Sequence, residues 1–149
     1  MDQVLPLLIE SAEAARDRQA GVLRQAQQAL QQAQDTLARL RQFRADCLAR
    51  SAGGSLGRAD AQSLGDYQRF VARLDQAIVM QQHEAQLRES RVAAAQRQLM
   101  QCQQKLLAFQ TLTQRRARQR EAVATRREQR EADEFAARAF QRQSSPLFS

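Results

Sequence analysis

The chain has 149 residues with two prolines, five glycines and no tryptophan, and its abundant residues are Ala, Gln, Arg, Leu and Glu. This composition argues against an ordinary globular domain and is typical of long helices. The formal charge of +7 comes mostly from arginine, so the partner classes to consider are nucleic acid, acidic protein surfaces and phospholipid headgroups.

Catalysis and metal binding find no support in the residue pattern. The sequence has no glycine-rich phosphate loop, no nucleophile beside a base and no CxxC or Cys/His spacing. Cys47 and Cys102 occupy seam positions of the heptad pattern described below, and His83, the only histidine, falls on an outer helix face. We therefore predict a non-enzymatic protein without a metal or cofactor, whose two thiols stay reduced.

The first expected helix covers residues 3–50, with Asp2 as its cap and Pro6 in its first turn. The apolar run from Val4 to Ile9 is too short for a membrane span and, with Pro6 inside it, is not a secretory signal. Leucine and alanine alternate along one narrow face, which predicts a thin coiled-coil seam. The seam positions are Ile9, Ala12, Arg16, Gln19, Leu23, Ala26, Leu30, Ala33, Leu37, Leu40, Arg44 and Cys47.

Residues 51–59 are expected to form a turn, because the sequence Ser-Ala-Gly-Gly-Ser-Leu-Gly is the only concentrated helix breaker. Asp60 is the expected cap of the second helix. A short turn between two amphipathic helices folds them back antiparallel, so that each apolar face covers the other. Residues at equal distances from the turn then face each other, which places Leu30 near Gln81 and Leu23 near Arg88.

The second expected helix covers residues 60–142, followed by a disordered tail at 143–149. Its apolar positions recur in steps of three and four with polar interruptions at Gln81 and Arg88. The seam consists of Tyr67, Val71, Leu74, Ile78, Ala85, Val92, Ala95, Leu99, Cys102, Leu106, Phe109 and Thr113. Beyond about Leu106, the second helix has no residues of the first helix opposite it. The sequence therefore predicts an all-α fold with a single domain, 1–149. This domain is an antiparallel two-helix coiled-coil hairpin with an overhanging C-terminal helix.

An apolar cluster beside the expected turn is the first candidate surface. It comprises Leu40, Phe43, Cys47, Tyr67, Phe70, Leu74 and Ala77. Phe43 and Phe70 fall just outside the strict seam, where an aromatic ring on a solvated helix is costly. They either shield the end of the seam or form a patch for a partner protein.

An arginine-rich stretch is the second candidate surface. Its members are Arg115, Arg116, Arg118, Arg120, Arg126, Arg127 and Arg130, against only Glu121 and Glu128. A solvated helix face is the simplest interpretation of such a run. Sequence-specific DNA binding is disfavoured, because a leucine-zipper basic region precedes its heptads and because stacking aromatics are missing here. An acidic protein surface fits better.

Two sequence blocks resemble the conserved motifs of a known protein family. Residues 67–78 read Tyr-Gln-Arg-Phe-Val-Ala-Arg-Leu-Asp-Gln-Ala-Ile, and they resemble the signature Y-x-x-F-(I/V/L)-x-x-L-(D/E)-x-A-I of the FliJ family. The stretch from Arg126 to Arg138 resembles the closing E-x-(K/R)-x-x-D-E-F-A-x-R of that family. Order, spacing, total length and the turn agree over residues 2–142.

The resemblance implies a non-enzymatic, soluble component of the bacterial flagellar type III export apparatus, similar to the gamma-subunit stalk of rotary ATPases. It implies three partners: the hexameric export ATPase, the export gate protein in the membrane and, for some members, export chaperones. Specific nucleic-acid binding and direct membrane insertion are not expected. The expected location is the cytoplasm, peripheral at the inner membrane face of the flagellar base. In isolation we expect a monomer, with coiled-coil self-association left open.

The same resemblance assigns residues to two contacts. The face that binds the export gate corresponds to Leu40, Phe43, Cys47, Phe70, Leu74, Ala77 and Gln81. For the ATPase ring, our hypothesis is that the seven arginines, together with the N-terminal turns around 5–12, enter the central pore.

Two alternatives stay open from the sequence. One is a basic, self-associating coiled-coil scaffold, which salt-sensitive DNA retention by a stable oligomer would indicate. The other is the equivalent stalk of a virulence-type secretion system, which the helix pattern does not separate from the flagellar one.

Overall fold

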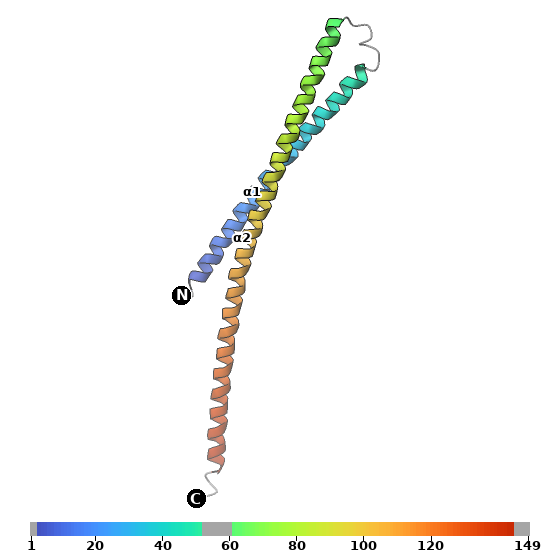
Figure 1. Ribbon diagram of the computed structural model, residues 1–149. Helices are drawn as coiled ribbons and strands as arrows, with labels where there is room; N and C mark the ends of the chain where they lie inside the picture. Colours follow the sequence, from blue (N-terminus) through green and yellow to red (C-terminus); the bar gives the residue numbers. More distant parts are fainter. Residues whose placement is uncertain (1–2, 52–60, 145–149) are drawn as a thin grey trace. The chain divides into compact units, whose positions relative to one another are not determined.

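The computed structural model describes residues 3–51 and 61–144, and these residues form two helices. The first, α1, spans Val4–Arg50, and the second, α2, spans Ala61–Ser144 (Figure 1). The two long helices pack antiparallel as a hairpin, so the predicted fold class is confirmed. The expected caps Asp2 and Asp60, most of the expected turn and the last residues of the expected tail lie outside the described residues.

Contacts within the chain fall into two compact units. The hairpin unit is Glu13–Gln103, and the terminal unit combines Met1–Ala12 with Gln104–Ser149. Both helices contribute to both units, because α1 begins in the terminal unit and α2 ends there. The organisation of the whole chain as a single domain stays a prediction.

The core of the hairpin unit is a narrow line of seam residues. Ala33 is the most buried of them, at 1% exposed, and Leu74, Ile78 and Ala95 are also buried. Each is a position that the heptad pattern assigned to the seam. Because alanine contributes less buried apolar area than leucine, this core is thin, and most other side chains of the unit stay in contact with water.

Two polar side chains of α2 cross the seam and bind the backbone of α1. Gln81 donates from Nε2 to the carbonyl oxygen of Ala33 at 3.1 Å, and Arg88 donates from Nη1 to the carbonyl oxygen of Ala29 at 2.7 Å. The Nε of Arg88 also donates to Glu84 at 2.9 Å. The small alanines leave room for these side chains, so both polar interruptions of the heptad pattern are satisfied inside the seam.

The side-chain contacts are displaced from the predicted pairing, in which residues at equal distances from the turn face each other. Gln81 reaches Ala33 rather than Leu30, and Arg88 reaches Ala29 rather than Leu23, three and six residues closer to the end of α1. Side chains lean toward the N-terminus of their own helix. In an antiparallel pair, this lean carries the side chains of α2 toward higher-numbered residues of α1, and the sequence-based pairing omitted it.

The terminal unit buries the first turns of α1 against α2. Leu5, Ala12 and Leu106 are all nearly inaccessible, and they are seam positions or lie beside them. On the other side of the first turns, Val4 and Leu7 are more than half exposed. The beginning of α1 therefore has one apolar face that is packed and another that faces solvent.

Candidate partner-binding surfaces

The apolar cluster beside the turn has an exposed part and a buried part. Phe43 and Phe70 are 49% and 43% exposed, and their rings meet edge to face with centroids 6.1 Å apart. Leu74 is buried. The remaining predicted members, Leu40, Cys47, Tyr67 and Ala77, are half-buried. The structure therefore brings the two phenylalanines together at the surface and places the other members beneath or beside them.

Gln81 differs from the rest of this predicted patch. Its amide is half-buried and donates to the carbonyl oxygen of Ala33 inside the seam. Within the patch, large exposed apolar surface comes from Phe43 and Phe70. We therefore define the phenylalanine pair, Phe43 and Phe70, as the candidate surface of the hairpin unit.

Polar contacts between α1 and α2 flank the phenylalanine pair. Arg44 forms an ion pair with Asp75, and the hydroxyl of Tyr67 donates to the carbonyl oxygen of Cys47 at 3.2 Å. The hydrogen bond to Asp75, and then its negative charge, raise the pKa of Arg44 above its ordinary value, so the guanidinium stays charged. The heptad pattern alone does not predict this ion pair, although a charged residue at a seam position is a signal for a partner on the facing helix.

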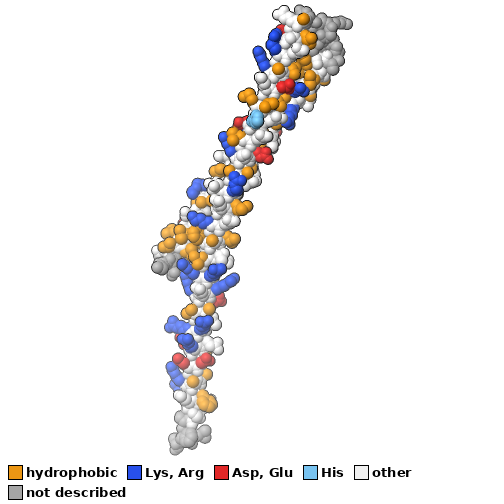
Figure 2. Space-filling view, viewed as in Figure 1, with side chains coloured by type: hydrophobic (Ala, Val, Ile, Leu, Met, Phe, Trp, Pro, Cys, Tyr) orange, Lys and Arg blue, Asp and Glu red, His pale blue; other side chains and the backbone are white. Residues whose placement is uncertain are grey.

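The arginine-rich stretch lies on α2 within the terminal unit. Six of its members, Arg115, Arg118, Arg120, Arg126, Arg127 and Arg130, are exposed, and Arg116 is half-buried. Arg127 forms an exposed ion pair with Glu131, with 3.4 Å between Nε and Oε1. Figure 2 shows the blue side chains gathered along this part of α2. The positive charge predicted from the sequence is thus presented to solvent on a continuous helix.

A groove of about 400 Å³ lies where the first turns of α1 meet α2. Its walls are mostly apolar, with arginines at one end. The lining residues are Leu5, Pro6, Ile9, Thr113, Arg116, Ala117 and Arg120. The groove therefore joins the N-terminal turns to the arginine-rich stretch, the two segments that the sequence analysis grouped for ring binding.

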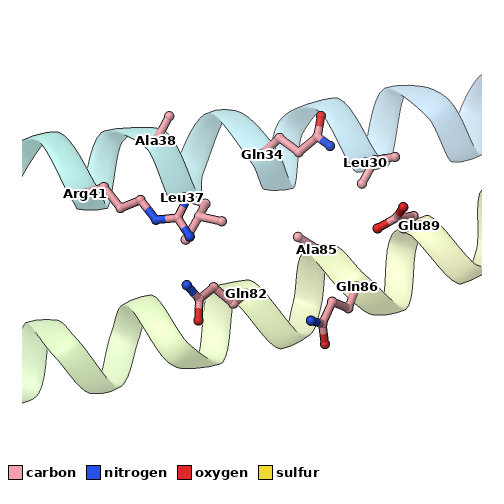
Figure 3. A pocket seen from close by; sticks show the side chains of 9 residues that line it. All are labelled: Leu30, Gln34, Leu37, Ala38, Arg41, Gln82, Ala85, Gln86 and Glu89. Atoms are coloured by element: carbon pink, nitrogen blue, oxygen red, sulfur yellow. The ribbon is translucent and has the colours of Figure 1, made fainter.

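A second groove, of about 540 Å³, lies between the helices of the hairpin unit (Figure 3). Leu30 and Leu37 reach toward α2, where the facing seam residue is the small Ala85, and glutamines of both helices border the opening. It contains no nucleophile with a base and no paired carboxylates. This open space results from a leucine layer packed against alanine, and it gives no basis for a catalytic site.

Two further features are absent from the described residues. None of the helices in those ranges combines the length and apolar character that crossing a bilayer requires. In the same residues, His, Cys, Asp and Glu side chains do not cluster in groups that could hold a metal ion. The candidate surfaces of the described chain are therefore the phenylalanine pair and the arginine-rich stretch.

Comparison with known protein families decides the classification. The family described as Flagellar FliJ protein matches residues 1–145, nearly the whole chain. The chain belongs to the FliJ family. FliJ membership implies a component of the flagellar export apparatus, with partners in that apparatus, and a non-catalytic stalk protein. No curated protein and no solved structure matches the chain.

Proposed function

We propose that the protein is the central stalk of the flagellar export apparatus. In this function it inserts into the hexameric export ATPase, promotes the assembly and activity of that ring, and links it to the membrane export gate. The protein works in the cytoplasm at the inner membrane face of the flagellar base. Escort of export chaperones is a secondary part of the proposal.

The observation that carries this proposal is the uncovered basic helix. Every residue of α2 from 117 to 138 is exposed. Its basic part ends at Arg130 and carries five of the seven arginines against Glu121 and Glu128, whereas Glu131, Asp133 and Glu134 follow it. Helices without a packed face are marginal in water, because most helical stability in proteins comes from tertiary packing. A helix of this kind is suited to a partner that surrounds it, as the central channel of a ring does.

Mixing the purified export ATPase with the protein tests the proposal directly. We expect the protein to increase the fraction of ATPase found as hexameric rings by electron microscopy, and to raise ATP hydrolysis in parallel. The physical reason is linkage, since a ligand that binds the ring but not its separated subunits shifts assembly toward the ring. An unchanged ring fraction over a concentration series of the protein would contradict the proposal.

The phenylalanine pair supports the link to the export gate. Aromatic residues, phenylalanine among them, are enriched at the cores of protein–protein interfaces. Replacing Phe43→Ala together with Phe70→Ala should leave helicity by circular dichroism nearly unchanged and weaken capture of the gate protein by about tenfold or more.

A matched control lies on the same unit. Val79 and Met80 are exposed apolar residues of α2, at 50% and 71%. Val79→Ala with Met80→Ala removes a comparable apolar area outside the pair, so gate capture should persist. Equal loss in both double variants would show that general apolar area, rather than the phenylalanine pair, supports the contact.

A further inference from the structure

The seam positions of α2 change from mostly apolar residues to arginines near the point where α1 begins. Up to Phe109, the seam positions of α2 carry mostly apolar residues. Continuing the same heptad steps past Thr113 gives Arg116, Arg120, Val123 and Arg127. The face of α2 that α1 covers elsewhere therefore continues as a line of three arginines around one valine. Arg116 and Arg120 still line the groove beside the first turns of α1, and Val123 and Arg127 follow along the same face. We call these four residues the arginine seam.

The charges around this seam are sorted by helix face. At about 100° per residue, six of the seven arginines fall within a sector of about 140°, and Arg118 lies outside it. Glu121 and Glu128 point to the side away from that sector. The sign of the face changes further along, where Glu131 and Glu134 occur. The basic face thus has a defined length, about 15 residues or roughly 22 Å.

The arginine seam is continuous with an interface that already exists. The groove of the terminal unit is lined by Leu5 and Ile9 of α1 and by Arg116, Ala117 and Arg120 of α2. Val123, further along, is 63% exposed. A helix that lay in line with α1 would pack an apolar residue on Val123 and place side chains opposite the three arginines.

We propose that the arginine seam docks an acidic amphipathic α-helix of a partner protein, in the position that a longer α1 would occupy. Charge complementarity sets the pattern of this partner: carboxylates opposite Arg116, Arg120 and Arg127, and one apolar residue opposite Val123. A nucleic acid satisfies the charge but leaves Val123 in water. The inference deepens the proposed function and rests on it, since it gives the ring-facing segment a partner of defined chemistry.

The test uses the full-length protein and a synthetic helical peptide of about 18 residues. The probe peptide carries glutamates and one leucine at heptad seam spacing, and a control peptide has the same composition in scrambled order. We expect fluorescence anisotropy to show about tenfold tighter binding of the patterned peptide, weakening as salt is raised. Equal binding of both peptides would overturn the proposal, because diffuse charge attraction would then explain it.

Variants of the protein locate the contact. Arg116→Glu with Arg127→Glu should abolish the preference for the patterned peptide, and a patterned peptide with lysines in place of glutamates should restore it. The control combines Arg118→Glu, Thr125→Glu and Gln129→Glu, which changes the net charge equally but lies on the other side of α2. A control variant that loses as much as the seam variant would overturn the proposal.

Two further measurements separate this inference from the proposed function. If the patterned peptide binds but the seam variant still stimulates the export ATPase fully, the docking face stands and its role in the ring is wrong. If the seam variant loses stimulation but neither peptide shows a preference, the proposed function stands and the acidic-helix partner is wrong. Binding of duplex DNA in place of the patterned peptide would also overturn the inference.

Discussion

Leu106→Asp is expected to release the first turns of α1 from α2, whereas Leu107→Asp is expected to leave them in place. The two leucines are adjacent, yet Leu106 is 4% exposed and Leu107 is 62% exposed. A carboxylate at the buried position would lose water without gaining a partner, at a cost of about 3 kcal/mol or more. At the exposed position, the change in the free energy of unfolding should stay within about 0.5 kcal/mol.

Amide hydrogen exchange with peptide-level resolution measures this difference. Exchange across residues 4–12 should accelerate in the Leu106→Asp variant, while exchange in the middle of the hairpin unit around Ala33 should stay close to that of the wild type. Urea unfolding gives the matching change in stability. Similar exchange in the two variants would show that packing of α1 on α2 does not depend on Leu106.

Reversing the charge at the start of the arginine-rich stretch is expected to remove stimulation of the export ATPase. The variant replaces four residues by glutamate: Arg115, Arg116, Arg118 and Arg120. It shifts the local charge by about eight units, so that a favourable contact with acidic or carbonyl-rich ring loops becomes repulsive or unpaired. We expect ATP hydrolysis in the mixture to fall to the rate of the ATPase alone.

The control for this variant keeps the charge and changes the geometry. Lysine at the same four positions preserves the positive field but removes the planar, bidentate guanidinium. Partial stimulation by the lysine variant, with none by the glutamate variant, would indicate that charge dominates the contact. Full stimulation by the glutamate variant would exclude these positions from the ring contact.

The fold was largely predictable because its main cause is a repeating local pattern. Steps of three and four residues identified the packed face of each helix, and the most buried residues, Ala33 and Leu106 among them, are seam positions. The pairing of individual residues was less predictable. Distance from the turn gives an approximate pairing of residues between the helices. The direction and length of side chains such as Arg88 decide which atoms are in contact.

The sequence predicts which residues lie near the candidate surfaces, but it does not predict which polar partners those residues contact. Phe43 and Phe70 were singled out because aromatic residues next to a seam are unusual, and the structure places their rings in contact. The ion pair of Arg44 with Asp75 was missed, because a heptad pattern records where residues face and omits which polar partners meet. For the same reason, Gln81 was grouped with the surface patch although its amide binds within the seam.

The hydrogen bonds from Gln81 and Arg88 to backbone carbonyls have a mechanical consequence for the hairpin unit. Each bond holds α2 at a fixed level on α1, and the two acceptor carbonyls, of Ala29 and Ala33, lie about one turn of helix apart on α1. Sliding one helix along the other would break both hydrogen bonds at once. It would leave the side chains of Gln81 and Arg88 without these partners among apolar seam residues. A force along the axis of α2 therefore moves α1 together with it, and sliding of the two helices along each other is opposed.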